Sequence, residues 1–320
     1  MGQVTTLSVD AVDDGVRLDR WLRRRWPQLG QVQIHKLARS GQLRVDGGRV
    51  KADTRLSAGA QVRVPPLPYA PAAIAAGQGI SPRDAAFARS LVLYEDEEVL
   101  ALNKPAGLAV QGGTKTLRHI DALLGAWGQG LERPRLVHRL DRDTSGVLVL
   151  GKSPGAAARL AGAFARREAK KTYWAIVAGV PDPAEGVISL ALAKSGARDR
   201  ERVSPADPDN SRAEIAETRF ATLSHAGRAA AWMALRPLTG RTHQLRVHLL
   251  AIGYPILGDP KYNTSQSKAL SGSLKLQLHA RRLVIAHPSK GMLDLEAPVG
   301  PHLAAGLARF GFDPASLEQP

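Results

Sequence analysis

The sequence predicts an α+β protein built from two parts, and three observations support this prediction. Basic residues concentrate near the start of the chain, where residues 15–65 hold twelve Lys and Arg against three Asp. Residues 65–89 contain five prolines among Ala and Gly, a composition typical of a semi-rigid linker. From Leu91 onward, short apolar runs of strand length recur, with helical patterns between some of them. We therefore expect a small basic domain at 15–65, a linker at 66–89 and a larger domain at 90–310.

The basic segment predicts two short helices followed by a hairpin. Apolar i, i+3, i+4 stripes predict one helix at about 17–26, ended by Pro27, and a second at about 31–40. Alternation at 43–45 then meets Asp46-Gly47-Gly48, a typical hairpin turn. The charge could belong to an ordinary solvated surface, but the strong excess of one sign favours contact with a polyanion.

The larger domain is predicted to consist of short strands and a few helices. Strands are expected at 91–94, 98–102, 136–137, 147–150, 174–178 and 232–235. Helices are expected at about 154–167, with Pro154 in the first turn, and at about 242–252, with Gly253 as the C-cap. The polar stretch 194–212 carries several Lys and Arg and is expected to form an exposed basic loop.

The composition narrows the class of protein. The 320 residues include 44 Lys and Arg against 29 Asp and Glu, a formal net charge of +15. A balance this basic favours a polyanionic partner, nucleic acid first and a membrane surface second. No apolar run approaches the roughly 18 residues that a membrane span needs, and the first residues lack the basic start of a signal peptide. The absence of cysteine excludes disulfides and thiolate metal sites. We therefore expect a cytoplasmic protein with no membrane association.

The most informative segment is His138–Gly146, which carries two Asp, two Arg and a His between two strand-like runs. Charged groups beside a core are costly unless they are paired, and such pairing is common in active sites. Folding alone gives no reason for this cluster. The segment is therefore the first candidate for a functional site.

The same region contains a literal phosphate-loop pattern that its residues argue against. Gly146–Ser153 matches G-x-x-x-x-G-K-[ST]. A phosphate loop needs flexible backbone whose amides surround phosphates, whereas the four middle residues here are Val-Leu-Val-Leu, which favour a strand. Pro154 follows at once and removes an amide from the start of the helix. We expect a strand here and no nucleotide site.

The two histidines at 243 and 248 do not form a metal-binding pattern. They lie five positions apart, about 140° around a helix, and so cannot share a metal on one helix face. One is expected to cap a helix or lie in the core, and the other to lie on the surface. The sequence contains no H-E-x-x-H motif.

Two further clusters combine polar chemistry with core patterns. One has Tyr173 near the start of an apolar run that follows two lysines. The other is Thr239–His248, in which Arg246 would point toward the core if the segment is helical. A buried Arg needs a carboxylate, and the nearest candidates are Asp141 and Asp143. The alternative is an Arg–Asp pair that only stabilises the fold.

Taken together, these clusters resemble the RluA-type pseudouridine synthases and, within them, the RluC-like enzymes of large-subunit ribosomal RNA. The resemblance covers nearly the whole chain. Its motifs occur in the family's order at Leu102–Gly107, Gln111–Gly113, His138–Gly146, Lys171–Gly179, Gly240–His248 and Pro255–Asp259. Residues 15–65 resemble the small S-four RNA-binding domain often found at the N-terminus of these enzymes.

The resemblance implies a catalytic domain built on a mixed, mainly antiparallel sheet with flanking helices. It implies an isomerase that breaks the N-glycosidic bond of specific uridines, turns the uracil and rejoins it through carbon 5, with no cofactor and no metal. The implied partner is RNA, namely large-subunit ribosomal RNA or its precursor particle, and the protein is expected to act as a monomer. The alternative is a non-catalytic RNA-binding ribosome-assembly factor on the same scaffold.

The resemblance also implies roles for five residues. Asp141 is the implied catalytic carboxylate, and Arg246 is the cation that pairs with it, keeps it ionised and orients it. Tyr173 is the implied active-site tyrosine, which packs against the uracil and can help to remove the proton at carbon 5. Arg139 would enter the RNA when the target base leaves the stack, and Leu245 would line the base pocket.

The second carboxylate of the charged turn is expected to have a structural role. Asp143 would brace the turn through Thr144 and Ser145 and take no part in chemistry. The stretch 194–212 is specific to this chain, so no substrate contact is inferred for it.

Overall fold

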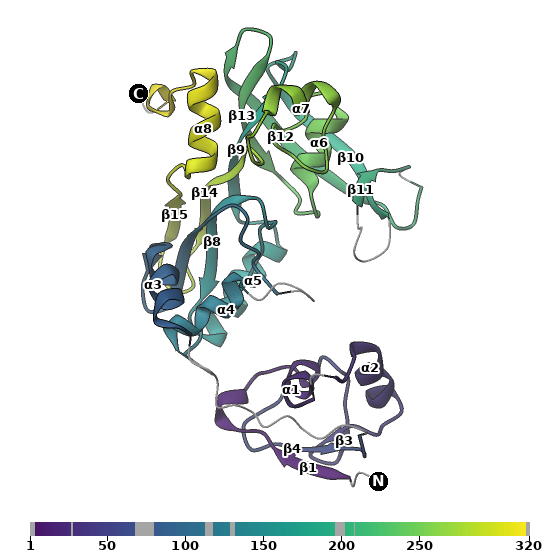
Figure 1. The fold of residues 1–320 in the computed structure, drawn as a ribbon. Coiled ribbons are helices and arrows are strands. Elements are labelled where there is room, and N and C mark those ends of the chain that lie inside the picture. The colour runs from purple at the N-terminus through teal and green to yellow at the C-terminus, as the bar shows by residue number, and fades with distance from the viewer. Residues whose placement is uncertain are drawn as a thin grey trace. The chain divides into compact units, whose positions relative to one another are not determined.

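The structure is a computed structural model that describes residues 4–26, 28–67, 80–112, 118–128, 132–195, 202–207 and 209–317. The chain divides into two compact units, one formed by residues 1–82 and 125–133 and the other by residues 83–124 and 134–320 (Figure 1). Each unit has its own sheet and its own buried core. Within the described ranges, no helix has the length and apolar character that a membrane span requires.

The first unit packs two helices against a small sheet whose order is β1–β4–β2–β3 and whose pairs are all antiparallel. Its elements are β1 (Thr5–Ser8), η1 (Ala11–Asp13), α1 (Leu18–Arg25), α2 (Gln31–Arg39), β2 (Arg44–Val45), β3 (Gly48–Arg49) and β4 (Gln61–Val64). Trp21, Leu22 and Ile34 are fully buried, as the apolar stripes predict. The turn between β2 and β3 places Asp46 and Gly47 at φ 49° and 77°, the left-handed conformations that a tight hairpin turn needs.

The second unit is built on a sheet that is antiparallel except for one described pair. The strand order is β11–β10–β12–β13–β9–β14–β8–β6–β5, with β15 paired to β14 and β7 paired to β8. The parallel pair is β14 with β8. The strands are β5 (Val92–Glu95), β6 (Val99–Lys104), β7 (Arg135–Leu136), β8 (Ser145–Gly151), β9 (Lys170–Ala178), β10 (Glu185–Ser195), β11 (Arg202–Pro205), β12 (Glu214–Ala226), β13 (Ala230–Pro237), β14 (Leu278–Ala286) and β15 (Met292–Glu296). The predicted mixed, mainly antiparallel sheet is confirmed.

Helices flank this sheet (Figure 1). The described helices after residue 80 are α3 (Pro82–Ser90), α4 (Ile120–Leu123), η2 (Leu124–Trp127), α5 (Pro154–Ala165), α6 (Gln244–Ala251), α7 (Ser265–Ser271), α8 (Pro301–Phe310) and η4 (Pro314–Leu317), and residues 125–127 of η2 belong to the first unit. Successive side chains of a strand point to opposite faces, and β9 shows this clearly. Ala175 and Val177 share a core cluster with α6, whereas Trp174 and Ile176 share another with α8. The centre of the sheet is therefore covered on both faces.

The phosphate-loop pattern lies in a buried strand. All seven residues of β8 are buried, and the strand pairs along its length with β6. Its backbone is therefore part of the sheet and does not form an open loop whose amides could surround a phosphate. Lys152, the lysine of the pattern, donates to the carboxylate of Glu95 and to the carbonyl of Asp96. The strand expected from Val-Leu-Val-Leu is confirmed.

Some segments differ from the sequence-based expectations. Residues 82–89, expected in the linker, belong to α3, which begins at Pro82, a residue well suited to the first turn of a helix. The expected basic loop at 194–212 contains β11, which pairs with the end of β10. Part of the expected linker, residues 68–79, lies outside the described residues. The same holds for residues 196–201 and 208 of the expected loop.

Candidate active site

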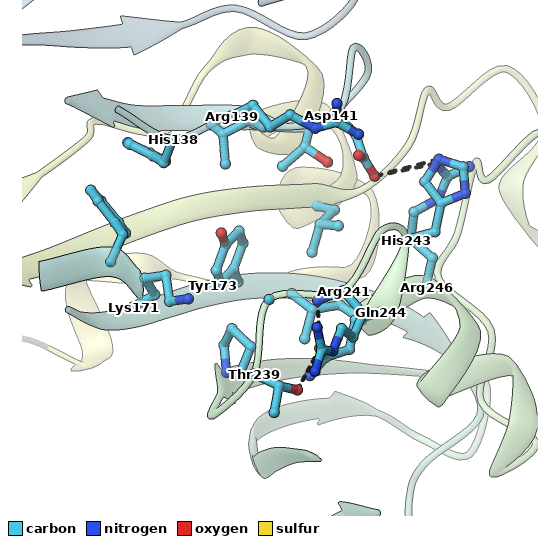
Figure 2. A pocket seen from close by; sticks show the side chains of 17 residues that line it. His138, Arg139, Asp141, Lys171, Tyr173, Thr239, Arg241, His243, Gln244 and Arg246 are labelled. Atoms are coloured by element: carbon cyan, nitrogen blue, oxygen red, sulfur yellow. Dashed lines mark hydrogen bonds and ion pairs between the residues drawn. The ribbon is translucent and has the colours of Figure 1, made fainter. Parts of the chain in front are cut away.

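A cavity of about 270 Å³ lies in the second unit. All five residues to which the resemblance gave a role line it, namely Arg139, Asp141, Tyr173, Leu245 and Arg246 (Figure 2). They come from three separate parts of the chain, the turn before β8, the start of β9 and the start of α6. The structure therefore brings together residues that the sequence shows only as separate clusters.

The register of the sheet explains why these separate segments lie close together. Tyr173 on β9 lies opposite Ala280 of β14, and Ser145 at the start of β8 lies opposite His279 on the other edge of β14. The turn before β8 therefore ends one strand away from Tyr173. On its other side Tyr173 lies opposite Leu235 of β13, and the loop after β13 leads into α6.

The turn that carries Asp141 is held by a buried lysine. Lys104 is fully buried, and its ammonium group donates to three backbone carbonyls, including that of Arg142 at 2.9 Å. Burial lowers the pKa of Lys104 to about 7, although the charges of Asp143 and Asp141 oppose this shift. Gly107 adds two hydrogen bonds to Arg142, one to its carbonyl and one from its guanidinium. The Asp143 side chain makes no hydrogen bond to any described residue, so the prediction that it braces the turn through Thr144 and Ser145 is wrong. Lys104 holds the turn instead, and the charge of Asp143 favours the protonated form of that lysine.

Two further contacts fix the exit of the turn into β8. Gly146 has a φ of 107°, and a Cβ at this position would lie 2.2 Å from the carbonyl oxygen of Ala280. Only glycine allows so close an approach of two backbones. The ring of His138 stacks on Phe164, and its Nε2 accepts a hydrogen bond from the amide of Val149 at 2.9 Å. Burial lowers the pKa of His138 to about 3, so this ring is a neutral structural group.

The carboxylate of Asp141 faces two side-chain nitrogen atoms without a hydrogen bond to either. Its Oδ2 lies 3.6 Å from Nη1 of Arg246 and 3.8 Å from Nε2 of His243 (Figure 2). Both distances exceed the usual length of an N–H···O hydrogen bond. The Asp141 side chain is 26% exposed and lines the cavity. Its oxygen atoms therefore lie near a cation and remain open to a substrate.

Arg246 is held by a second carboxylate, that of Asp259, which differs from the two partners predicted from the sequence. Its Nε and Nη2 donate to Oδ2 and Oδ1 of Asp259 at 2.8 and 2.7 Å, a bidentate pair. Asp259 also accepts from the amides of Lys261 and Tyr262. Burial alone would lower the pKa of Arg246, but the hydrogen bonds to Asp259 and the charges of Asp259 and Asp141 outweigh it and raise the pKa. The predicted burial of Arg246 is confirmed, and its closest partner is Asp259.

The loop before α6 is fixed by the buried side chain of Gln244. Its Oε1 accepts from the hydroxyl of Thr239 at 2.7 Å and from the amide of Arg241 at 3.0 Å, and its Nε2 donates to the carbonyl of Glu217. The helix begins at Gln244 because His243 adopts a left-handed φ of 54°. The predicted start at 242 is therefore two residues too early, and His243 is a helix-flanking residue that faces Asp141.

Tyr173 and Leu245 provide an apolar part of the cavity lining. The cationic side chains of Arg139 and Lys171 line the same cavity (Figure 2). Burial, reinforced by the charge of Asp141, raises the pKa of Tyr173 far above its usual value, so the phenol stays neutral. Arg139 is exposed, and Lys171 is half-buried with a pKa lowered by burial. Neither cation has a carboxylate partner among the described residues. The cavity thus combines an aromatic wall, one carboxylate and a positive rim.

The histidines do not form a metal site in the described part of the chain, where no group of three or more His, Asp or Glu side chains is placed to hold an ion. His248 is fully buried, and burial lowers its pKa to about 4. His243 is also partly covered, with a side chain 17% exposed. The expectation that one of the two lies on the surface is wrong.

Comparison with known proteins gives consistent results for sequence and structure. A family model described as RNA pseudouridylate synthase matches residues 98–251. The chain is 33% identical over 301 residues to ribosomal large subunit pseudouridine synthase C of Vibrio parahaemolyticus, covering 93% of each protein. It is 34% identical over 318 residues to the protein of the same description from Vibrio cholerae, covering 96% of this chain and 97% of the relative. The solved structure of human RNA Pseudouridylate Synthase Domain Containing 4 matches with a TM-score of 0.61 and 28% identity, covering 72% of this chain and 98% of that one.

Proposed function

Because this chain belongs to the RNA pseudouridylate synthase family, we propose that it modifies uridines of large-subunit ribosomal RNA or its precursor particle, with Asp141 as the catalytic carboxylate. The family isomerises uridine in RNA to pseudouridine, and the chain is an isomerase of this kind. The substrate is proposed from the relatives, which are described as ribosomal large subunit enzymes. One observation carries the assignment of Asp141, namely that its oxygen atoms are open to the cavity while a buried Arg lies 3.6 Å away.

The proposed chemistry needs an ionised carboxylate. In the reaction the bond between N1 and the ribose C1′ breaks, the uracil turns, a bond between carbon 5 and C1′ forms, carbon 5 loses its proton and N1 gains one. Asp141 can begin this sequence by attack on the sugar, by attack on the base or by removal of a sugar proton, and each route uses a free carboxylate lone pair. The cation of Arg246 favours the charged form and limits the orientations of the carboxylate.

Tyr173 is proposed to hold the uracil through its ring. Its pKa is raised by burial and by the charge of Asp141, so the phenol is neutral near pH 7. A neutral aromatic side chain in the cavity wall suits packing against a planar base. The alternative role as the base that accepts the carbon 5 proton would need a phenolate, which the same burial disfavours.

The positive rim is proposed to stabilise RNA from which the target base has been displaced. Arg139 is exposed at the cavity and makes no ion pair with a described residue. A free guanidinium can fill the gap left by an extruded base, which offsets part of the few kcal/mol that extrusion costs. Lys171 adds a second cation beside Tyr173, where a phosphate of the bound strand would be neutralised.

The rival function is that of a non-catalytic assembly factor, and the cavity argues against it. A protein that only binds RNA has no use for Asp141, Tyr173 and Arg246 around one open cavity. The direct test uses an in vitro transcript of large-subunit ribosomal RNA that carries tritium at carbon 5 of its uridines. We expect tritium release in proportion to pseudouridine formed at a few discrete positions. Tight binding with no release would support the assembly factor and reject the proposed activity.

A second prediction concerns RNA binding by the first unit. Arg20, Arg23, Lys36 and Arg39 are exposed on α1 and α2, and their side chains make no ion pair within the described residues. If they contact phosphates, changing all four to Gln weakens RNA binding and makes the salt dependence of affinity less steep. Each lost contact to a single strand changes the slope by about 0.7, so the total change is at most about 3.

The measurement for the first unit is affinity at several salt concentrations. The matched control replaces Arg20, Arg23 and Arg39 with Lys, which keeps every charge and should keep the slope. An unchanged salt dependence of affinity in the Gln variant would show that this surface does not bind RNA.

A further inference from the structure

A buried tyrosine behind the cavity connects two of the groups that face Asp141. Tyr262 is 1% exposed and is not among the residues that line the cavity. Its hydroxyl oxygen lies 2.9 Å from the amide nitrogen of Val203 on β11 and 2.9 Å from Nδ1 of His243.

The hydroxyl of Tyr262 determines which nitrogen of His243 carries a proton. The amide of Val203 can only donate to the hydroxyl oxygen, so Nδ1 of His243 is the one described partner that can accept the proton of this buried hydroxyl, which would otherwise have no acceptor. Burial lowers the pKa of His243, against the opposing charge of Asp141, so the ring is neutral near pH 7. A neutral ring whose Nδ1 accepts carries its proton on Nε2. That nitrogen is the one 3.8 Å from Oδ2 of Asp141.

The rest of Tyr262 contacts the other group that faces Asp141. The guanidinium carbon of Arg246 lies 5.0 Å from the centroid of the Tyr262 ring, within the range of a cation–π contact. The amide of Tyr262 donates to Asp259 Oδ1 at 2.9 Å, and Asp259 is the carboxylate that holds Arg246. The rings of Tyr262 and His243 meet edge to face, with centroids 5.4 Å apart. Tyr262 therefore restrains both His243 and Arg246, the two side chains that face Asp141.

We propose that Tyr262 is a positioning residue for Asp141, which it serves by holding His243 as the Nε2–H tautomer. The proposal rests on the proposed role of Asp141. With the other tautomer, the lone pair of Nε2 would face the carboxylate and repel it. The fixed tautomer instead presents a donor beside Arg246 and adds no net charge, so the carboxylate stays nucleophilic. The left-handed backbone of His243, uncommon for a residue other than Gly, is what turns the ring between Tyr262 and Asp141.

The first test reads the tautomer in the unmodified protein. Nitrogen-15 NMR of the full chain, with the His243 signals assigned by their loss in His243→Asn, distinguishes a protonated ring nitrogen from an unprotonated one. We expect Nε2 protonated and Nδ1 unprotonated near pH 7. A protonated Nδ1 would overturn the proposal without any variant of Tyr262 being needed.

The second test is Tyr262→Phe, which keeps the ring and removes only the hydroxyl. We expect kcat for pseudouridine formation to fall about 10- to 100-fold, the range found when the hydrogen-bond partner that orients a metal-ligating side chain is lost, with KM for RNA nearly unchanged. In this variant both His243 tautomers should be visible by NMR. The matched control is Tyr94→Phe, which also removes a hydrogen-bonded phenol, one that donates to Asp96 at 2.7 Å and does not line the cavity. The control should keep the kcat of the unmodified enzyme, whereas an equal loss of kcat in both variants would overturn the proposal.

The third test asks whether Tyr262 acts through His243. Asn tolerates a left-handed backbone, so His243→Asn removes the imidazole and keeps the local fold. If Tyr262 acts through the imidazole, adding Tyr262→Phe to His243→Asn lowers kcat no further, whereas independent effects multiply. Multiplying effects would overturn the proposal. Absence of any activity in the unmodified enzyme would instead reject the proposed function, and a fully active Tyr262→Phe variant would reject only the positioning role.

Discussion

Replacing Asp141 with Asn is expected to lower the rate of pseudouridine formation by at least about a thousandfold, with little change in RNA affinity. The two side chains have nearly the same shape, so the cavity and the packing around it should persist. The amide carries no charge, however, and cannot act as a nucleophile or as a base. The Arg246 cation, 3.6 Å from the carboxylate in the unmodified protein, then has no charged reactant to stabilise. The loss should therefore appear in kcat and not in KM.

The measurement is single-turnover release of tritium from carbon 5 of uridine, together with a filter-binding assay for affinity. The chain provides a matched control in Asp143, two residues further along the same turn. Its side chain makes no hydrogen bond to a described residue and does not line the cavity. Asp143→Asn removes the same charge and should retain most of the activity. Comparable rates in the two variants would show that Asp141 is not the catalytic group.

The elements that the sequence predicted well are those decided by neighbouring residues. The stripes of α1 and α2, the turn at Asp46 and the buried strand β8 each depend on a pattern a few residues long. The long strands β10 and β12 were missed because each has one partly solvated face. Ile215 on β12 is 52% exposed, so apolar residues do not mark its buried side cleanly. Strand β14 was missed because Arg281 and Arg282 interrupt it, and the acidic residues of β15 that balance them come later in the chain.

In the site, too, features set by nearby residues were predicted, whereas contacts between residues distant in the sequence were not. The sequence predicted that Arg246 would be buried and would need a carboxylate, since both follow from the helix pattern. It could not show that Asp259 would be the bidentate partner, because this depends on how the chain after α6 returns beside that helix. The place of His243 depends equally on its own backbone conformation and on Tyr262. Asp259 and Tyr262 belong to one turn, and that turn supports the site without lining it.

The ion pair between Arg246 and Asp259 leads to the second large prediction. Asp259→Asn keeps the size of the side chain and one acceptor oxygen, but it leaves the buried guanidinium of Arg246 with no carboxylate at hydrogen-bond distance, because Asp141 lies 3.6 Å away. Breaking a buried pair from one side costs about 3–5 kcal/mol, because the remaining charge has lost both its solvent and its partner. We expect the free energy of unfolding to fall by this amount in urea titrations. The exposed pair of Arg282 and Asp294 provides the control, since Asp294→Asn should cost less than about 1 kcal/mol.

The kcat of this variant distinguishes two roles of the Arg246–Asp259 pair, namely stabilising the fold and keeping Arg246 from direct contact with Asp141. At a temperature where Asp259→Asn is still folded, the freed guanidinium can move the short distance to Asp141 and form the hydrogen bonds that the unmodified protein withholds. Those bonds would occupy the carboxylate lone pairs that the reaction needs, so kcat should fall by more than about tenfold even in fully folded protein. A folded Asp259→Asn variant with the normal kcat would show that the bidentate pair only stabilises the fold. A fall in kcat with no loss of stability would show instead that the buried charge of Arg246 finds another partner, and that Asp259 acts mainly by keeping Arg246 away from direct contact with Asp141.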